Sequence, residues 1–333
     1  MSRRMEDLAR RWWGGELGAA GVALDVALAP AEAAYRLGTL LRNHAYDRGM
    51  LTSEKAPLPV ISVGNIAVGG TGKTPFTSWL ARRLEARGEV PAIVHGGYAA
   101  DEPELHRSWT PHIPVVVDRN RARAVERAHA AGATVAVLDD AFQHRRLRRD
   151  LDIVLISVER WSGAARLLPR GAWREPPAAL RRAGLVVCVR KTAVEAESAE
   201  LASAIGRATG QAVMRVYLHA SAWRQGDAPS SAPPEQCVIA VGLADHGLFV
   251  ANARAAGAAV GAELIFPDHH EYDAADVDRI RAAAAGRPVV TSAKDWVKLR
   301  GRMDAAQTWV LTQELVVEDG GALLDAAVDG ALE

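Results

Sequence analysis

Cysteine is scarce in this sequence, and neither sign of charge is in excess. The 333 residues include 40 Lys and Arg against 40 Asp and Glu, so the formal net charge is zero. General binding to nucleic acid depends on surplus cations that release counterions from the phosphate backbone, so we expect no nucleic-acid partner. The two cysteines, Cys188 and Cys237, lie in apolar runs without another cysteine or histidine at ligand spacing. This placement predicts buried thiols in a reducing, cytosol-facing compartment rather than a disulfide or a metal site.

A long hydrophobic run is also missing. No window reaches the roughly 20 apolar residues that span a bilayer, and the N-terminus lacks the apolar core of a secretory signal. Residues 16–35 come closest, but Asp25, Pro30 and Glu32 interrupt them. The side chains that recur there at helical spacing are Leu17, Leu24, Leu28, Ala31 and Tyr35. With two tryptophans before them and arginines on both sides, they are typical of a helix at a membrane surface. A helix packed on the protein's own core would show the same pattern.

After residue 55 the sequence alternates between short β-rich runs and helical segments. The β-rich runs lie at residues 60–63, 91–94, 115–117, 135–138, 153–158 and 185–189, and helical segments such as 76–87 and 122–131 separate them. Short apolar strands alternating with helices predict a parallel sheet covered on both faces. We therefore predict an α/β fold with a doubly wound, mostly parallel sheet over residues 56–212, after a helical N-terminal segment at 1–55.

A second, smaller α/β domain is predicted beyond a linker. Residues 213–218 form an extended run, and residues 221–234 are rich in Ser, Pro, Ala and Gly, which is typical of a hinge between domains. Further β-rich runs follow at 238–241, 262–266, 288–291 and 308–311. The expected boundaries are a linker at 213–234 and a domain at 235–333.

One glycine-rich loop joins the first predicted strand to a predicted helix. Residues 64–74 read GNIAVGGTGKT, where glycines let backbone N–H groups turn toward phosphates and the next helix directs its positive end at them. The pattern predicts a P-loop for ATP and Mg²⁺, with Lys73 on the phosphates and the Thr74 hydroxyl on the metal. The residues predicted to hold the nucleotide are Ala67, Val68, Gly69, Gly70, Thr71, Gly72, Lys73 and Thr74. Ala67 stands where the first glycine of the usual G-x-x-x-x-G-K-T pattern is expected, and a chance glycine-rich turn is the alternative.

Two aspartates end the apolar run at residues 135–138. An apolar strand that ends in carboxylates is the usual acidic partner of a P-loop, because it places negative charge beside Mg²⁺ at the carboxyl edge of the sheet. Asp139 and Asp140 are therefore predicted to lie at the metal. A turn after the strand would have the same composition.

A phosphotransferase needs a group near the acceptor hydroxyl that takes its proton. Asp101, after the second predicted strand, and His269, after a strand of the second domain, are the candidates. Either one alone is equally consistent with a solvated loop residue. An arginine-rich run at 145–149 would bind an anionic acceptor, or form a solvated face.

These motifs together resemble the tetraacyldisaccharide 4′-kinase family, the lipid A precursor kinases. The resemblance covers most of the chain, from about Trp12 to Leu311. The segments that carry it, in order, are 64–75, 101–103, 139–144, 167–176, 266–270 and 291–295. It implies transfer of the γ-phosphate of ATP to the 4′-hydroxyl of a tetraacylated glucosamine disaccharide 1-phosphate. It also implies a peripheral enzyme at the cytoplasmic face of the inner membrane, with the N-terminal helix on the membrane surface.

The resemblance also implies roles for particular residues. Asp101 would be the general base, with His269 paired to it across the two domains, and Lys73 would stabilise the phosphates. The residues implied around the metal and nucleotide are Thr74, Asp139, Asp140, Gln143 and Glu175. Further candidates for contact with the acceptor are Asn65, Arg119, His144, Arg145 and Arg149.

The sequence departs from the family pattern after the second predicted strand. The family pattern there reads Ser-Arg-Gly-Tyr-Gly, but this chain has His95 and Gly96 in place of the serine and the arginine. Ala141 replaces a glycine of the acidic motif, and the loop at 242–246 lacks an expected proline. The missing arginine leaves room for a weaker enzyme or a shifted acyl-disaccharide substrate.

Two other classes share this loop. One is a nucleotide-switch protein, such as a GTPase-like metallochaperone, and the other is a P-loop kinase with a soluble acceptor. The guanine motif Asn-Lys-x-Asp should follow the run at 185–189, where this chain reads Arg190-Lys191-Thr192-Ala193. Without that aspartate nothing accepts the guanine N–H groups, which favours ATP. The interfacial N-terminus favours a lipid acceptor.

Overall fold

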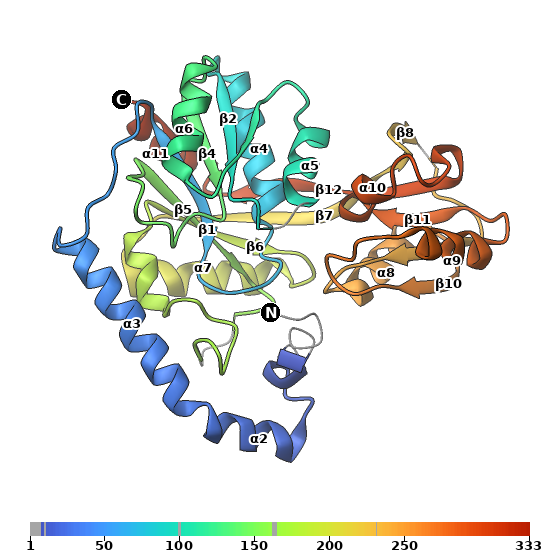
Figure 1. Cartoon of the computed structure of the whole chain (residues 1–333), viewed down its shortest axis with the longest axis horizontal. Helices are drawn as coiled ribbons and strands as arrows, with labels where there is room; N and C mark the ends of the chain where they lie inside the picture. The colour runs from blue at the N-terminus through green and yellow to red at the C-terminus, as the bar shows by residue number, and fades with distance from the viewer. Residues whose placement is uncertain (1–7, 10, 99–100, 162–164, 231) are drawn as a thin grey trace.

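The computed structural model describes residues 8–9, 11–98, 101–161, 165–230 and 232–333. In this part of the chain, twelve strands form one continuous sheet that runs through two lobes (Figure 1). Residues 1–7 and 10 of the predicted N-terminal segment lie outside the described residues.

The larger lobe holds the parallel half of the sheet. Its strands in spatial order are β3 (Val115–Val117), β2 (Pro91–His95), β4 (Val135–Asp139), β1 (Val60–Asn65), β5 (Leu151–Ser157), β6 (Leu185–Arg190) and the first part of β7 (Val213–Gln225). Neighbouring strands in this series pair in parallel. Because these strands are parallel, the carboxyl ends of β1, β2 and β4 lie at the same edge of the sheet.

Helices cover both faces of this half-sheet. On one face, α4 (Lys73–Ala86) packs Phe76 and Leu80 against Ile61 and Val63 of β1. The helices on the other face are α6 (Arg121–Ala130), the short η1 (Pro177–Arg182) and α7 (Glu195–Thr209). A further helix, α5 (Asp101–Trp109), packs beside α4. The predicted doubly wound α/β sheet is confirmed.

The smaller lobe is a second parallel α/β unit. Its strands are β10 (Val260–Ile265), β9 (Cys237–Val241), β11 (Val289–Ser292) and the start of β12 (Thr308–Asp319), in that spatial order. Its helices are α8 (His246–Ala255), α9 (Ala274–Ala284), α10 (Ala293–Leu299) and the single turn η2 (Ala305–Gln307). A short strand, β8 (Ala228–Ser230), pairs with the end of β7.

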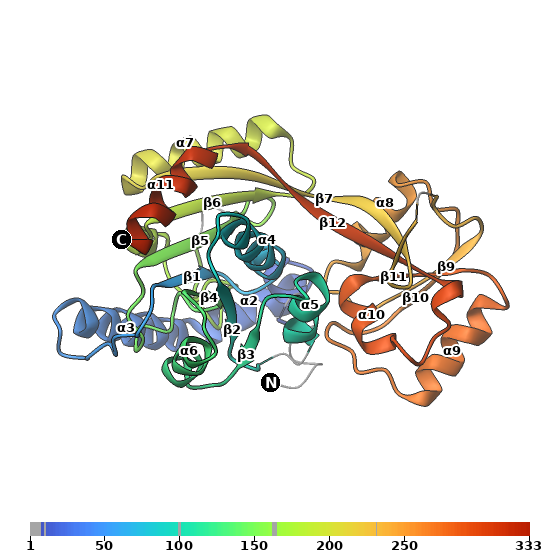
Figure 2. The ribbon, with the colours of Figure 1, turned by 90° about the horizontal axis from the view of Figure 1, so that it is seen from above.

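An antiparallel ribbon of β7 and β12 connects the lobes (Figure 2). This differs from the predicted linker at 213–234, because β7 continues through the Ser- and Ala-rich residues as far as Gln225. The predicted C-terminal domain at 235–333 also needs correction. After β12 returns along the ribbon, α11 (Gly321–Leu332) packs Leu324 and Val328 into the core of the larger lobe.

Two N-terminal helices extend along the side of the larger lobe (Figure 1). They are α2 (Gly18–Ala27) and α3 (Ala29–Asp47), so the predicted helix at 16–35 is divided at Leu28 and continues further. Their contact with the lobe is polar: Glu32 is buried, accepts the Leu167 N–H at 2.9 Å and pairs with Arg170 at 3.0 Å. Among the described helices, none is long and apolar enough to cross a membrane.

Candidate active site

The glycine-rich loop follows β1, and α4 begins at Lys73. Gly72 precedes the helix with φ +85°, a left-handed conformation that favours glycine. Ala67 and Val68 are held by the segment at 172–173, where the Val68 N–H donates to the Ala172 carbonyl at 2.7 Å. The Lys191 ammonium donates to the Gly70 carbonyl at 2.7 Å. These contacts shape residues 67–72 from outside the loop.

Asn65 lies beneath this loop. It is fully buried, and its amide donates to the Thr71 hydroxyl at 3.0 Å. The structure therefore places Asn65 as a support of the loop and not at a surface where an acceptor would bind.

Lys73 faces Asp140, with Nζ 3.6 Å from Oδ1, and Thr74 is the next residue of α4. Arg174 donates to both oxygens of Asp140, at 2.9 and 3.1 Å. Burial alone would raise the pKa of Asp140, but the charges of Lys73 and Arg174 outweigh it and hold the pKa below its ordinary value. Asp140 is thus a carboxylate at neutral pH, beside the lysine of the loop.

Asp139, by contrast, is directed into the protein. It is buried, its Oδ1 accepts the Thr77 hydroxyl at 3.3 Å, and its Oδ2 lies 3.0 Å from His106 Nε2. Burial opposes ionisation, but the bond and the charge of His106 hold the pKa of Asp139 at about 2. The two predicted acidic residues therefore have different surroundings.

Glu175 and Gln143 form a buried cluster behind the loop. Both oxygens of Glu175 accept from Arg182, at 2.8 and 3.1 Å, and Asn43 and Gln143 also donate to them. Gln143 in turn donates to the Asn65 carbonyl at 2.8 Å. The carboxylate of Glu175 is thus engaged by protein donors, and the cluster links α3 to the loop.

Asp101 and His269 come together from opposite lobes. His269 Nδ1 lies 3.0 Å from each oxygen of Asp101, which begins α5 and is 3% exposed. Lys298 Nζ lies 3.0 Å from Asp101, and Lys294 Nζ is 3.0 Å from His269 Nε2. Burial opposes ionisation, yet the bond from His269 and the charges of Lys294 and Lys298 hold the pKa of Asp101 well below its ordinary range.

The other residues that were predicted to contact the acceptor substrate do not form one cluster. Arg119 is exposed. Arg145 pairs with Asp47 of α3 at 2.7 Å, and Arg149 pairs with Asp152 at 2.8 Å. Burial and the neighbouring arginines lower the pKa of His144 to about 4. Arg145 and Arg149 are therefore engaged in ion pairs within the protein.

Arg121, which the sequence analysis missed, lies directly behind the acidic strand end. It is 2% exposed and donates to the Asp139 carbonyl at 3.2 Å. A Cβ atom at Gly96 would lie 2.3 Å from its Nη1. The guanidinium of Arg121 therefore occupies the space into which a side chain at position 96 would extend.

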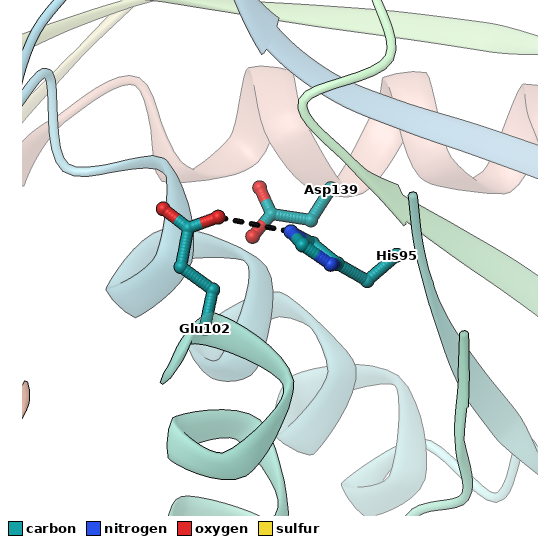
Figure 3. Close-up of side chains that lie close together, drawn as sticks. All are labelled: His95, Glu102 and Asp139. Atoms are coloured by element: carbon teal, nitrogen blue, oxygen red, sulfur yellow. Dashed lines mark hydrogen bonds and ion pairs between the residues drawn. The ribbon is translucent and has the colours of Figure 1, made fainter. Parts of the chain in front are cut away.

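The sequence analysis also missed two histidines near Asp139, which are His106, described above, and His95. His95 ends β2, and its Nε2 lies 2.9 Å from Glu102 Oε2 on α5 (Figure 3). Potential ligand atoms of His95, Glu102 and Asp139 lie within 4.8 Å of one another. No spacing in the sequence indicated this cluster, because its members come from three separate elements.

Comparison with known proteins agrees with this geometry. The family model for tetraacyldisaccharide-1-P 4′-kinase, LpxK, matches residues 24–332. A tetraacyldisaccharide 4′-kinase of Anaeromyxobacter dehalogenans is 37% identical over 91% of this chain and 88% of the relative. One of Halorhodospira halophila is 35% identical over 92% of each chain.

A solved structure shares the fold. The crystal structure of LpxK from Aquifex aeolicus in complex with ATP superposes with a TM-score of 0.75 at 27% identity, covering 93% of this chain and 100% of that one. The loop, the acidic strand end and the pair formed across the lobes thus occur in a chain that matches these kinases over nearly its whole length. The chain belongs to the tetraacyldisaccharide-1-P 4′-kinase family.

Proposed function

We propose that this chain transfers the γ-phosphate of ATP to the 4′-hydroxyl of a tetraacyldisaccharide 1-phosphate, the lipid A precursor. The observation that carries the proposal is the contact of Asp101 with His269. It supports the proposal because Asp101 begins α5, which follows β2 at the carboxyl edge of the sheet and packs beside α4, the helix that follows the glycine-rich loop. The proposed acceptor is the tetraacyldisaccharide for which the family and its members are named.

The Asp101–His269 pair takes the proton of the acceptor. Asp101 is ionised at neutral pH, which a base requires, and His269 holds its carboxylate from the opposite lobe. As the proton moves to Asp101, the acceptor oxygen bonds to the γ-phosphorus, the bond to the bridging oxygen breaks, and ADP leaves. Lys73 stabilises the negative charge on the phosphates through this step.

The donors for Mg²⁺ are the Thr74 hydroxyl and the Asp140 carboxylate. Both are hard oxygens, as this ion prefers, and the ion pair of Asp140 with Lys73 places its carboxylate at the phosphate loop. Bound Mg²⁺ would neutralise charge on the phosphoryl oxygens. Glu175 and Gln143 support the loop from behind, because their own polar atoms are already engaged by Arg182, Asn43 and the Asn65 carbonyl.

The N-terminal helices bring the enzyme to its lipid. Val26 is 72% exposed and Leu40 is 64% exposed, while Glu32 and Asn43 face the protein. Further exposed apolar side chains on these helices include Val22, Tyr35, Leu37 and Leu41, and Met50 and Leu51 follow just after α3. A helix pair with polar groups inward and apolar groups outward fits a membrane surface. We place the protein at the cytoplasmic face of the inner membrane, as a peripheral enzyme.

The two alternative classes are less well supported. The loop at 190–193 contacts the phosphate loop through Lys191, but Ala193 offers no acceptor for guanine. The exposed apolar surface on α2 and α3 would have no use in a kinase with a soluble acceptor.

The direct test is transfer of labelled γ-phosphate from Mg-ATP to a tetraacyldisaccharide 1-phosphate in detergent micelles. We expect label in the lipid with the wild-type protein and about a hundredfold less with Lys73→Ala, since the phosphates lose their charged partner. Binding of ATP without labelling of the lipid would disprove the assigned acceptor and leave the nucleotide site standing.

A further inference from the structure

We propose that His106 is a positioning residue for phosphoryl transfer, which fixes helix α5 and its Asp101 relative to Asp139 at the end of β4. This inference rests on the proposed kinase function. It concerns a residue that does not touch substrate, because His106 is completely buried.

His106 stands at the centre of a buried polar chain. Its Nε2 lies 3.0 Å from Asp139 Oδ2, and its Nδ1 lies 2.7 Å from the Ser78 hydroxyl. Asp139 Oδ1 accepts from Thr77, the neighbour of Ser78 on α4. Three elements that carry the proposed chemistry are thereby joined: α4 with Lys73, α5 with Asp101, and β4, which ends at Asp139 just before Asp140.

In this buried polar network, the ionised carboxylate of Asp139 determines which atom donates to it. Asp139 is ionised and can only accept, so His106 Nε2 donates to it. His106 Nδ1 lies 2.7 Å from the Ser78 hydroxyl, so each of these polar atoms has a partner. A leucine would fill similar space but would leave a buried carboxylate oxygen without its donor, which makes a space-filling role a poor account of this residue.

His106 and Asp101 lie close together on α5, so the position of one affects the position of the other. His106 lies five residues after Asp101, which corresponds to about 7.5 Å along the axis of α5. A shift of His106 therefore moves the start of the helix, where Asp101 meets His269. A displacement of about 1 Å at a reacting group can reduce a rate about a hundredfold.

A second histidine holds the same helix at its first turn. His95 Nδ1 accepts the Gly97 N–H at 3.0 Å, so its Nε2 carries the proton and donates to Glu102, the residue after Asp101 (Figure 3). That tautomer leaves Nε2 without a lone pair for a cation. The proximity of His95 to Glu102 is thus explained by their hydrogen bond, and α5 is anchored at two points.

The test compares His106→Leu, His106→Gln and the control His112→Gln, which alters an exposed histidine just after α5. We measure kcat, KM for ATP, KM for the lipid, and thermal unfolding. His106→Leu should lower kcat about tenfold or more with KM for ATP within about twofold, because the base is displaced while the loop remains. His106→Gln keeps a donor for Asp139 and should recover most of kcat, and the control should match the wild type.

An unchanged kcat in His106→Leu, or equal losses in His106→Leu and His106→Gln, would overturn the inference. If His106→Leu does not fold, Ser78→Ala decides: a loss of about threefold or more in kcat supports the inference, since His106 loses one anchor, and an unchanged kcat overturns it. A wild-type protein that transfers no phosphate would instead refute the proposed function itself. Stoichiometric Mn²⁺ binding without nucleotide, abolished by His95→Gln, would assign the second anchor to a metal and contradict its part in this account.

Discussion

At the scale of single residues, two of the four described non-glycine residues with positive φ lie where the chemistry is proposed. Asp140 and His269 are not glycines, yet their φ angles are 50° and 54°. Such conformations are unfavourable by about 1–3 kcal/mol each and persist only where the surroundings hold them. Asp140 is held by Lys73 and Arg174, and His269 by Asp101 and Lys294. Two of these contacts, Asp140 with Lys73 and His269 with Asp101, are ones that the proposed reaction uses.

The charge of Lys298 is one of several that lower the pKa of Asp101. Its ammonium lies 3.0 Å from Asp101 and helps to hold the pKa of that carboxyl low. Lys298→Met removes a cation that favours the carboxylate, so the pKa of Asp101 should rise. The acid limb of the kcat/KM profile should therefore move to higher pH. The exposed Lys55→Met is the control and should leave it in place; an acid limb that stays or moves to lower pH in Lys298→Met would count against the assignment.

Gly96 and Arg121 should be coupled. A Cβ at Gly96 would lie 2.3 Å from Arg121 Nη1, and Arg121 is buried. Gly96→Ala should therefore displace the guanidinium and lower the free energy of unfolding by about 1–3 kcal/mol, as measured by urea denaturation. Gly247→Ala is the matched control, because no atom lies within 4 Å of the added methyl group. A neutral Gly96→Ala would contradict the proposed coupling.

The sequence could identify Lys73, Asp140, Asp101 and His269 as candidates because each follows a recognisable strand or loop. It could not identify His95, His106 or Arg121. Their partners lie on other elements, and a histidine or arginine in a helix or at a strand end is usually solvated. Only packing shows that these polar groups are buried and bonded.

At the scale of elements, the short parallel strands were predictable because burial on both faces makes them continuous apolar runs. β3 at Val115–Val117 has the expected bounds, and β4 differs by one residue at its end. The ribbon of β7 and β12 was harder to recognise. Past Leu311 the strand is partly exposed and reads Thr312, Gln313, Glu314, so the apolar signal ends before the strand does.

The return of α11 to the larger lobe yields a test of element packing. Leu324 is 1% exposed among Phe76 and Leu80, whereas its neighbour Leu323 is 43% exposed. Leu324→Ala should lower the free energy of unfolding by about 2–5 kcal/mol, and Leu323→Ala should change it by about 0.5 kcal/mol or less. Urea denaturation measures both. Equal effects of the two substitutions would show that α11 does not pack on the larger lobe in solution.

At the scale of the whole molecule, one sheet passes through both lobes, and the proposed site lies where the lobes meet. The sequence indicated two α/β units, but contact between residues 101 and 269 depends on the ribbon that orients the lobes. The exposed apolar side chains of the N-terminal helices α2 and α3, which lie along the outside of the larger lobe (Figure 1), form the proposed membrane-binding surface.

That surface should bind anionic phospholipid vesicles. Replacing Val26 and Leu40 by aspartate should reduce partitioning about tenfold or more in a sedimentation assay, since burying each such side chain contributes about 1.5–3 kcal/mol. Val194→Asp changes an apolar residue of similar exposure on the larger lobe and should have no effect. Unchanged partitioning of the double variant would disprove the membrane role of α2 and α3.

The central claim is that Asp101 and His269 act as one unit across the two lobes. A double-mutant cycle of Asp101→Ala and His269→Ala on kcat, with ATP affinity measured in parallel, tests it most directly. We predict that each single variant loses about a hundredfold or more in kcat at nearly unchanged ATP affinity, and that the double variant loses little beyond the larger single loss. Fully additive losses would show that the two residues act independently, and a parallel loss of ATP affinity would show that Asp101 serves the nucleotide instead of the acceptor.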